Sequence, residues 1–225
     1  MARKKLARFK ENENFPHVIE PSRSQIMQGF SHRGKWQELF ARPHPLVLEL
    51  GCGKGEYTVA MAKKFPELNF VGVDVKGARI WYGAKTVDDE DIPNAAFLRT
   101  QVELLDQCFA PGEVSEIWIT FPDPQIKFKR MKHRLTNPDF LEMYARVMKP
   151  GGLLHLKTDS EFLYGYTCGI LQNLDYPVYE AYHDIDLQLN QRDHLLHGVQ
   201  THYEKLFREK GKPITYLKFG LHASQ

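Results

Sequence analysis

Short apolar segments that alternate with helical segments are the feature of this sequence that most restricts its fold. The segments 45–51, 68–75 and 95–101 are apolar throughout rather than at every second residue. Strands of this kind are buried on both faces, as in a parallel sheet that helices cover on each side. Segments 56–65 and 77–87, which lie between them, have helical spacing. The pattern therefore predicts an α/β fold with a mostly parallel sheet.

The rest of the chain continues the alternation and completes a predicted sheet of seven strands with helices on both faces. The further strands are predicted at 116–123, 153–159, 178–185 and 213–220. Residues 1–22 are rich in lysine and arginine, and Pro16 and Pro21 oppose a helix there, so we expect a flexible basic N-terminal arm. Residues 23–225 are expected to form a single domain.

The composition is that of a soluble globular protein. Of 225 residues, 42% are hydrophobic and 26% are charged, and no apolar run approaches the ~20 residues that span a bilayer. The start, MARKKLARFK, has no hydrophobic segment of the kind that a secretory signal carries. Cys52, Cys108 and Cys168 are few and far apart, which predicts no disulfide framework and a cytoplasmic location. No complete metal-ligand spacing occurs, so neither a metal nor a membrane partner is expected.

The segment LELGCGKGEYT, which follows the first predicted strand, predicts a ligand-binding turn. Glycines here let the chain turn tightly and let a ligand approach the backbone closely. They are Gly51, Gly53 and Gly55. A dinucleotide fingerprint would place a glycine where Glu56 stands, and an acid there would oppose a pyrophosphate. The P-loop pattern is also absent, so a cofactor without phosphates fits better.

Two carboxylates accompany this glycine loop. Asp74 ends the second strand, where an acid accepts hydrogen bonds from ribose hydroxyls, and Glu49 suits a cationic amino-acid group. The combination resembles the class I S-adenosylmethionine-dependent methyltransferases. The resemblance implies a Rossmann-like fold, S-adenosyl-L-methionine as the cofactor, and Gln101 as the side chain that holds the adenine amino group. The alternative is a tight turn that only packs a helix on a strand.

The fourth strand ends in TFPDP, which predicts a rigidly placed carboxylate. Pro122 and Pro124 fix φ on either side of Asp123 and push the preceding residues into extended geometry. Rigid placement suits a functional site, and we expect Asp123 to be both catalytic and close to the cofactor. The alternative is a structural turn in which Asp123 accepts local backbone N–H groups.

A basic stretch follows Asp123 directly. Its cations are Lys127, Lys129, Arg130, Lys132 and Arg134. They do not share one helical face, so we expect a loop, which is either a solvated surface loop or a clamp for a phosphate backbone. The net charge of +2 is too small to indicate a polyanion by itself, but local basic patches suit selective contact with one.

The stretch FPDPQIKFKRMKHRL resembles the FPDPW-x-K-x-R-H-x-K-R-R-L motif of tRNA (guanine-N7-)-methyltransferases. LKTD and THYEKLFREKGKPI resemble two later motifs of that family, in the same order along the chain. Gln125 departs from the motif, because the family usually has tryptophan there. The resemblance implies methylation of guanine N7 at position 46, in the variable loop of tRNA, to give 7-methylguanosine.

Residue roles follow from the same resemblance. It implies that four residues of these motifs bind the substrate, namely Lys127, Asp159, Thr201 and Glu204. It also implies RNA contacts by residues 129–134, which include Lys129, Arg130, Lys132 and Arg134. Chemically, Asp159 or Glu204 suits the guanine edge, since a carboxylate accepts from two adjacent donors. The partner is then tRNA, bound by a monomer or a homodimer.

Two other functions are compatible with parts of the sequence. A methyltransferase acting on a small molecule or a protein would share the glycine loop but would leave the basic stretch without a role. A non-catalytic RNA-binding protein on the same scaffold would share the basic stretch but would not need the glycine loop, Asp74 and Asp123 together. Binding of S-adenosylmethionine separates this last reading from the two enzymes.

Overall fold

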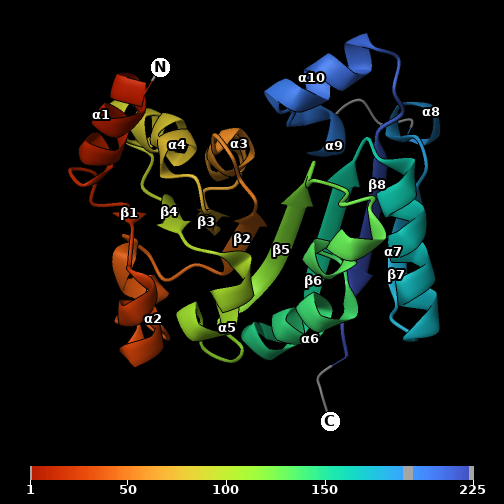
Figure 1. Ribbon diagram of the computed structural model, residues 1–225, viewed down its shortest axis with the longest axis horizontal. Helices are drawn as coiled ribbons and strands as arrows, with labels where there is room; N and C mark the ends of the chain where they lie inside the picture. The colour runs from red at the N-terminus through yellow and green to blue at the C-terminus, as the bar shows by residue number, and fades with distance from the viewer. Residues whose placement is uncertain (1, 190–194, 223–225) are drawn as a thin grey trace.

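The computed structural model describes residues 2–189 and 195–222 and contains one eight-stranded sheet with the order β1-β4-β3-β2-β5-β6-β8-β7 (Figure 1). The strands are β1 (Val18–Ile19), β2 (Leu46–Leu50), β3 (Asn69–Asp74), β4 (Ala95–Arg99), β5 (Val114–Thr120), β6 (Met148–Thr158), β7 (Val178–Tyr182) and β8 (Thr215–Gly220). All seven predicted strands are confirmed. The eighth, β1, is the addition.

The sheet is mostly parallel, as predicted. β1, β4, β3, β2, β5 and β6 are joined by parallel pairings, whereas β8 is antiparallel to both β6 and β7. The carboxyl ends of β2, β3, β4 and β5 therefore meet at one edge. Ligands of such sheets bind beyond this edge, which Figure 1 shows at the upper side of the sheet.

Helices cover both faces of the sheet. The longer elements are α1 (Ala2–Asn12), α2 (Arg23–Gly29), α3 (Glu56–Lys64), α4 (Gly77–Asp89), α6 (Pro138–Val147), α7 (Glu161–Asn173) and α10 (His202–Glu209), with shorter helices α5 (Leu105–Cys108), α8 (Ile185–Gln188) and α9 (Leu195–Gly198). Adjacent strand residues point into different apolar clusters: Leu46 and Leu48 face one, and Val47 faces the other. This explains why the strands are apolar throughout.

The N-terminal segment differs from the flexible arm that the sequence predicts. Ala2–Asn12 form α1, which packs along α4 (Figure 1). The indole N–H of Trp81 on α4 donates to Glu11 at 2.9 Å, and the guanidinium of Arg8 lies 4.8 Å from the Trp81 ring. Side chains of α4 thus supply partners that composition alone does not reveal. The segment also contributes β1 to the sheet, so its structure is continuous with that of the domain.

The basic stretch after β5 also differs from the expected loop. Phe128–His133 form a short 3-10 helix, η3, with no buried residue. Helices of this kind are common as short connectors. In the part of the chain that the structure describes, no helix is both long enough and apolar enough to cross a bilayer.

Candidate active site at the carboxyl edge of the sheet

The glycine turn after β2 has the backbone geometry that its sequence predicts. Gly51, Gly53 and Gly55 have φ values of +73°, +58° and +70°, a region that other residues rarely adopt. A Cβ at Gly55 would also lie 2.5 Å from the ring of Phe97. The turn therefore needs glycine both for its backbone and for its packing against β4.

Asp74 lies at the end of β3 and is tied to this turn. One carboxylate oxygen accepts the backbone N–H of Gly53 at 2.9 Å, and the other accepts that of Lys76 at 2.8 Å. An ionised carboxylate has about four acceptor positions, so each oxygen retains capacity for a ligand hydroxyl. Asp74 is thus held in place and still able to bind.

Glu49 is buried at the base of the same site. It accepts hydrogen bonds from the Thr120 hydroxyl at 2.6 Å and from the Thr58 backbone N–H at 2.8 Å. Burial raises the pKa of Glu49 to about 7, and the hydrogen bonds from Thr120 and Thr58 oppose that rise only in part. A cationic group entering beside Glu49 would favour its ionised form.

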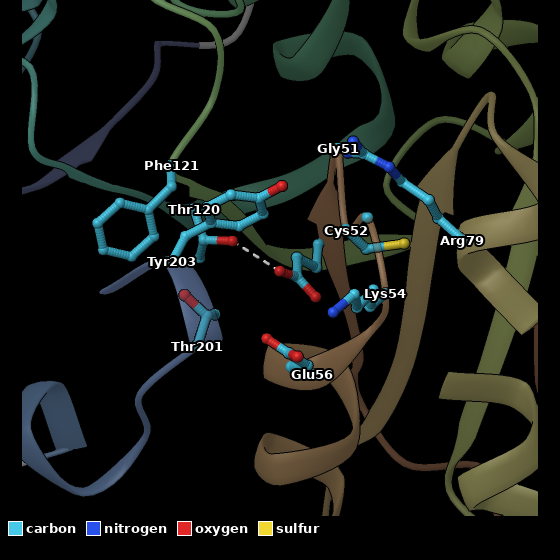
Figure 2. A pocket seen from close by; sticks show the side chains of 11 residues that line it. Gly51, Cys52, Lys54, Glu56, Arg79, Thr120, Phe121, Thr201 and Tyr203 are labelled. Carbon is cyan, nitrogen blue, oxygen red and sulfur yellow. Dashed lines mark hydrogen bonds between the residues drawn. The ribbon is translucent and has the colours of Figure 1, made fainter. Parts of the chain in front are cut away.

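The site is a pair of adjoining cavities. The smaller, of about 160 Å³, is lined by Glu49, Gly53 and two residues that Figure 2 labels, Gly51 and Thr120. Further residues that Figure 2 shows around it are Lys54, Glu56, Arg79, Phe121, Thr201 and Tyr203. The larger, of about 420 Å³, contains Asp74, Gln101 and Asp123. Both cavities include Gly51, Arg79 and Phe121, so they form one continuous depression along the strand ends.

Both interpretations that the sequence leaves open apply to Asp123, because it forms a local turn and also lines the larger cavity. Its Oδ1 accepts the backbone N–H of Gln125 at 3.0 Å, which is a local turn. The side chain nevertheless lines the larger cavity with Asp74 and Gln101. Phe121 and Gln125 have φ values of +47° and +46°, and such values in non-glycine residues are strained and concentrate at functional sites.

Gln101 lies after β4 at the edge of the larger cavity. Its side-chain oxygen accepts a hydrogen bond from Arg23 at 3.2 Å. This contact orients the amide, with its carbonyl towards α2. No local sequence pattern indicates Arg23 as its partner, because 78 residues separate the two.

The predicted RNA contacts fall into two groups. Lys129, Arg130 and Lys132 are exposed on η3, and Lys127 is exposed immediately before it. Arg134, by contrast, is only 6% exposed. Its location does not match the prediction that it lies at an RNA-binding surface.

Arg134 is enclosed between the FPDP loop and α7. Its guanidinium donates to the backbone carbonyl of Gln125 twice at 3.2 Å and to that of Ile126 at 3.3 Å. Its other surroundings are the rings of Phe162 and Tyr166, at 4.8 and 4.5 Å. These contacts tether the loop that carries Asp123 to α7.

Glu204 also differs from the sequence prediction, which expects it to bind substrate. Its side chain is fully buried and pairs with Lys157 at 2.8 Å and with Arg208 at 2.8 Å. With both neighbouring cations engaged, the carboxylate has no exposed edge for a base. The reason is that Glu204 lies on the inner side of α10, above the end of β6.

Lys157 binds backbone carbonyls near the site in addition to its buried ion pair with Glu204. Its ammonium also donates to the carbonyls of Leu196 and Val199 at 2.8 and 3.2 Å. Burial lowers the pKa of Lys157, and the Glu204 carboxylate opposes that shift. Lys157 and Glu204 thus join β6 to the segment that enters α10.

The other two predicted substrate residues are Thr201, which is 8% exposed, and Asp159. Thr201 is the N-cap of α10, where its hydroxyl accepts the Glu204 N–H at 3.2 Å, and it also lines the smaller cavity. Asp159 follows β6 and pairs with Lys212 at 2.8 Å. Side-chain exposure in that pair is 17% for Asp159 and 48% for Lys212, so a substrate can compete for the carboxylate.

Several residues of the site were not predicted from the sequence. Thr120 ends β5 and binds Glu49, and Arg79 and Tyr203 line the cavities. The position of Thr120 at a strand end beside FPDP was the available signal, because that edge holds ligands. Within residues 2–189 and 195–222, no group of three or more side chains could hold a metal ion.

Comparison with known proteins agrees with this geometry. A family model described as "Putative methyltransferase" matches residues 43–217. The 16S rRNA methyltransferase KamB has the same fold, with a TM-score of 0.61 at 15% sequence identity over 91% of this chain and 98% of the other. The fold and the glycine turn with its acids define a class I methyltransferase.

Two relatives show which family within this class the chain belongs to. The tRNA (guanine-N(7)-)-methyltransferase of Christiangramia forsetii is 56% identical over 97% of this chain and 98% of its own length. That of Porphyromonas gingivalis is 49% identical over 93% of this chain and 86% of its own. The chain belongs to the tRNA (guanine-N(7)-)-methyltransferase family.

Proposed function

We propose that this protein transfers a methyl group from S-adenosylmethionine to N7 of guanine in tRNA, to form 7-methylguanosine. The observation that carries the proposal is the position of Asp123. It lines one cavity with the glycine turn and Asp74, and the exposed cations of the basic stretch begin only four residues beyond it, at Lys127. Methyl transfer and contact with a polyanion are thus possible within one site.

The residues present fit the cofactor. The glycine turn allows close approach to the backbone, Asp74 retains acceptor capacity for ribose hydroxyls, and Glu49 at the base of the smaller cavity suits the ammonium of an amino acid. Gln101, on the edge of the larger cavity, is the candidate for the adenine amino group. When bound, S-adenosylmethionine supplies a methyl group on a sulfonium, so its transfer leaves a neutral thioether and a cationic purine.

Methylation of guanine N7 requires no proton transfer by the protein. Guanine N7 carries a lone pair and no proton, so no general base is needed. Alignment of the reacting atoms supplies most of the acceleration, and such alignment is worth up to about 7–11 kcal/mol. The site residues therefore act by binding, orienting and excluding water.

Asp123 has an electrostatic role in this proposal. Positive charge develops on the purine during transfer, and a fixed carboxylate stabilises it more in the transition state than in the ground state. One oxygen of Asp123 accepts the Gln125 N–H, which leaves the other for the base. Arg134 holds the carbonyls of the same turn and so keeps Asp123 in place.

The substrate-binding residues are revised by their surroundings. We propose that Lys127, Asp159 and Thr201 contact the tRNA nucleotide, with Asp159 as the acceptor for the guanine edge in exchange for Lys212. Glu204 acts indirectly, since it is enclosed by Lys157 and Arg208. By family resemblance, the base is guanine 46 of the variable loop.

Phosphates are bound by Lys129, Arg130 and Lys132 in this account. All three are exposed on η3, and surface cations of this kind position a nucleic acid without reading its sequence. A methyltransferase for a small molecule would leave them without a partner, and a binding module without catalysis would not need the glycine turn.

The cellular setting is also part of the proposal. We infer that the enzyme acts in the cytoplasm, as a monomer or a homodimer, with residues 23–225 as one domain to which β1 adds an edge strand. Analytical ultracentrifugation of the full chain with and without tRNA distinguishes the two assembly states.

The test is incubation of the protein with S-adenosylmethionine and unmodified tRNA, followed by borohydride and aniline, which cleave the chain at 7-methylguanosine. We expect new cleavage in the variable loop. A reaction without cofactor is the control. Cleavage elsewhere would overturn the position, and no cleavage together with cofactor binding would overturn the substrate.

A further inference from the structure

The segment between Gln125 and Arg134 exposes apolar side chains as well as cations. Phe128 is 83% exposed, Ile126 is 65% exposed and Met131 is 40% exposed. Phe128 is the most exposed of the large hydrophobic side chains in the described residues. A ring exposed to this extent contributes little to the stability of the free protein, because it buries almost no area there.

Cations surround this ring on both sides in the chain. Lys127 and Lys129 are its neighbours, and Arg130 and Lys132 follow in η3. Among residues 2–189 and 195–222, no carboxylate forms an ion pair with any of these four side chains. The segment is therefore complementary to a partner that is anionic and also has a flat apolar face.

An unpaired nucleotide has both properties. Its phosphates match the cations, and its base has a π-face on which an aromatic side chain stacks whatever the sequence. A membrane surface or an apolar protein would match only part of this set. The two ends of η3 are tied together, because Arg134, which follows η3, binds the carbonyls of Gln125 and Ile126, which precede it. Phe128 is thus presented on a tethered segment.

We propose that Phe128 is a stacking platform for an unpaired base of the RNA substrate, adjacent to but distinct from the base that is methylated. The inference rests on the proposed function, since it takes tRNA as the partner. It adds a contact that is apolar, independent of salt and outside the two cavities. Lys129 and its neighbours bind phosphate, while the ring binds a base face.

The test compares tRNA affinity of Phe128→Ala, Phe128→Leu and Phe128→Tyr in the full chain over a series of salt concentrations. Loss of a stacked base weakens binding about tenfold, equivalent to ~1.4 kcal/mol. We expect that loss in the alanine and leucine variants, near-normal affinity in the tyrosine variant, and an unchanged slope of affinity against salt in all three. Lys129→Ala should instead reduce that slope by about one.

The matched control is Tyr179→Ala. Tyr179 is also an exposed aromatic residue, at 57%, but it lies on β7 next to Val178, which pairs with Phe219 at the opposite end of the sheet from the site. This variant should bind tRNA normally. In addition, Phe128→Trp should show more fluorescence quenching on tRNA addition than the wild type, whose Trp36 and Trp118 are buried and whose Trp81 is partly buried.

Each outcome separates the inference from the proposed function. Unchanged affinity of Phe128→Ala, with normal methylation by the wild type, would overturn the stacking role and leave the function intact. Full affinity in the leucine variant, or a reduced salt slope in the alanine variant, would also overturn stacking. Loss of self-association in Phe128→Ala with unchanged tRNA affinity would assign the ring to a second copy of the chain. Absence of methylation by the wild type would overturn the proposed function, while the binding data would still decide the role of Phe128.

Discussion

Asp74, the predicted carboxylate at the end of β3, lines a cavity. The predicted carboxylates on the α10 side, Glu204 and Asp159, are instead paired with cations. Asp74 accepts only backbone N–H groups and keeps acceptor positions for a ligand. Glu204 is closed off by Lys157 and Arg208, and Asp159 is shared with Lys212. Asp74 on the cofactor side is thus held by backbone N–H groups, whereas the acids on the substrate side form ion pairs between distant segments.

This difference separates carboxylates that are available to bind a ligand from carboxylates that hold segments of the protein together. An uncompensated acid such as Asp74 remains available to a ligand, and an acid enclosed by two cations does not. Asp123 lies between these cases, because it has a local N–H partner and also lines a cavity. The same contrast applies to Arg134, which is buried, and to Lys129, which is exposed.

The largest effect on stability is expected at the buried ion pair. Lys157→Met leaves Glu204 buried with one cation fewer, and breaking such a pair costs about 3–5 kcal/mol. Urea unfolding measures the free energy. The double variant Lys157→Met/Glu204→Leu should recover part of that loss. If the two single losses simply added in the double variant, the two side chains would not be coupled and the comparison would fail.

The second effect concerns Glu49 and the pH dependence of stability. Its pKa of about 7 in the folded protein lies above the ordinary value of 4.5, so between these values the folded protein holds a proton that the unfolded chain releases. Stability therefore falls as pH rises from about 4.5 to 7, by about 3 kcal/mol. Glu49→Gln should lack this fall and be more stable than the wild type above pH 7.

Unfolding free energies at several pH values between 4.5 and 8 measure this difference. Glu67→Gln is the control, because Glu67 is an exposed glutamate away from the site. Its curve should run parallel to that of the wild type. A parallel curve for Glu49→Gln as well would contradict the assignment of a raised pKa to Glu49.

A smaller loss is expected at Arg134. Arg134→Met keeps the packing between Phe162 and Tyr166 but removes the donors to Gln125 and Ile126, and we expect about 2 kcal/mol of destabilisation, as for the loss of hydrogen bonds from a charged group. The rate of methyl transfer should also fall, since the turn of Asp123 is released. Normal stability with a reduced salt dependence of tRNA binding would instead return Arg134 to the RNA surface.

The smallest effect on the folded protein is expected at Lys129. Lys129→Ala should change stability by less than about 0.5 kcal/mol, as exposed substitutions do. It should weaken tRNA binding and reduce the salt slope by about one. Equilibrium binding at three salt concentrations gives the slope, and a slope equal to that of the wild type would remove Lys129 from the phosphate contacts.

The sequence was sufficient for seven of the eight strands and for the backbone geometry of the glycine turn. Strand polarity, the glycine turn and Asp74 follow from residues close together in the chain, where spacing determines geometry. The burial of Arg134 and Glu204 depends on α7 and β6, which no local pattern reports. Helix α1 was missed for the same reason, because its partners Trp81 and Tyr82 lie on α4.

The most direct test of the account is the rate of methyl transfer by Asp123→Asn in a single turnover with saturating cofactor. Asparagine can still accept the Gln125 N–H, so it removes the charge and keeps the turn. We predict a fall of about 10²–10³-fold in the rate, comparable to the loss of one electrostatic contact to a transition state, with unchanged affinity for S-adenosylmethionine. A rate equal to that of the wild type would contradict the claim that a fixed carboxylate stabilises the methylated base.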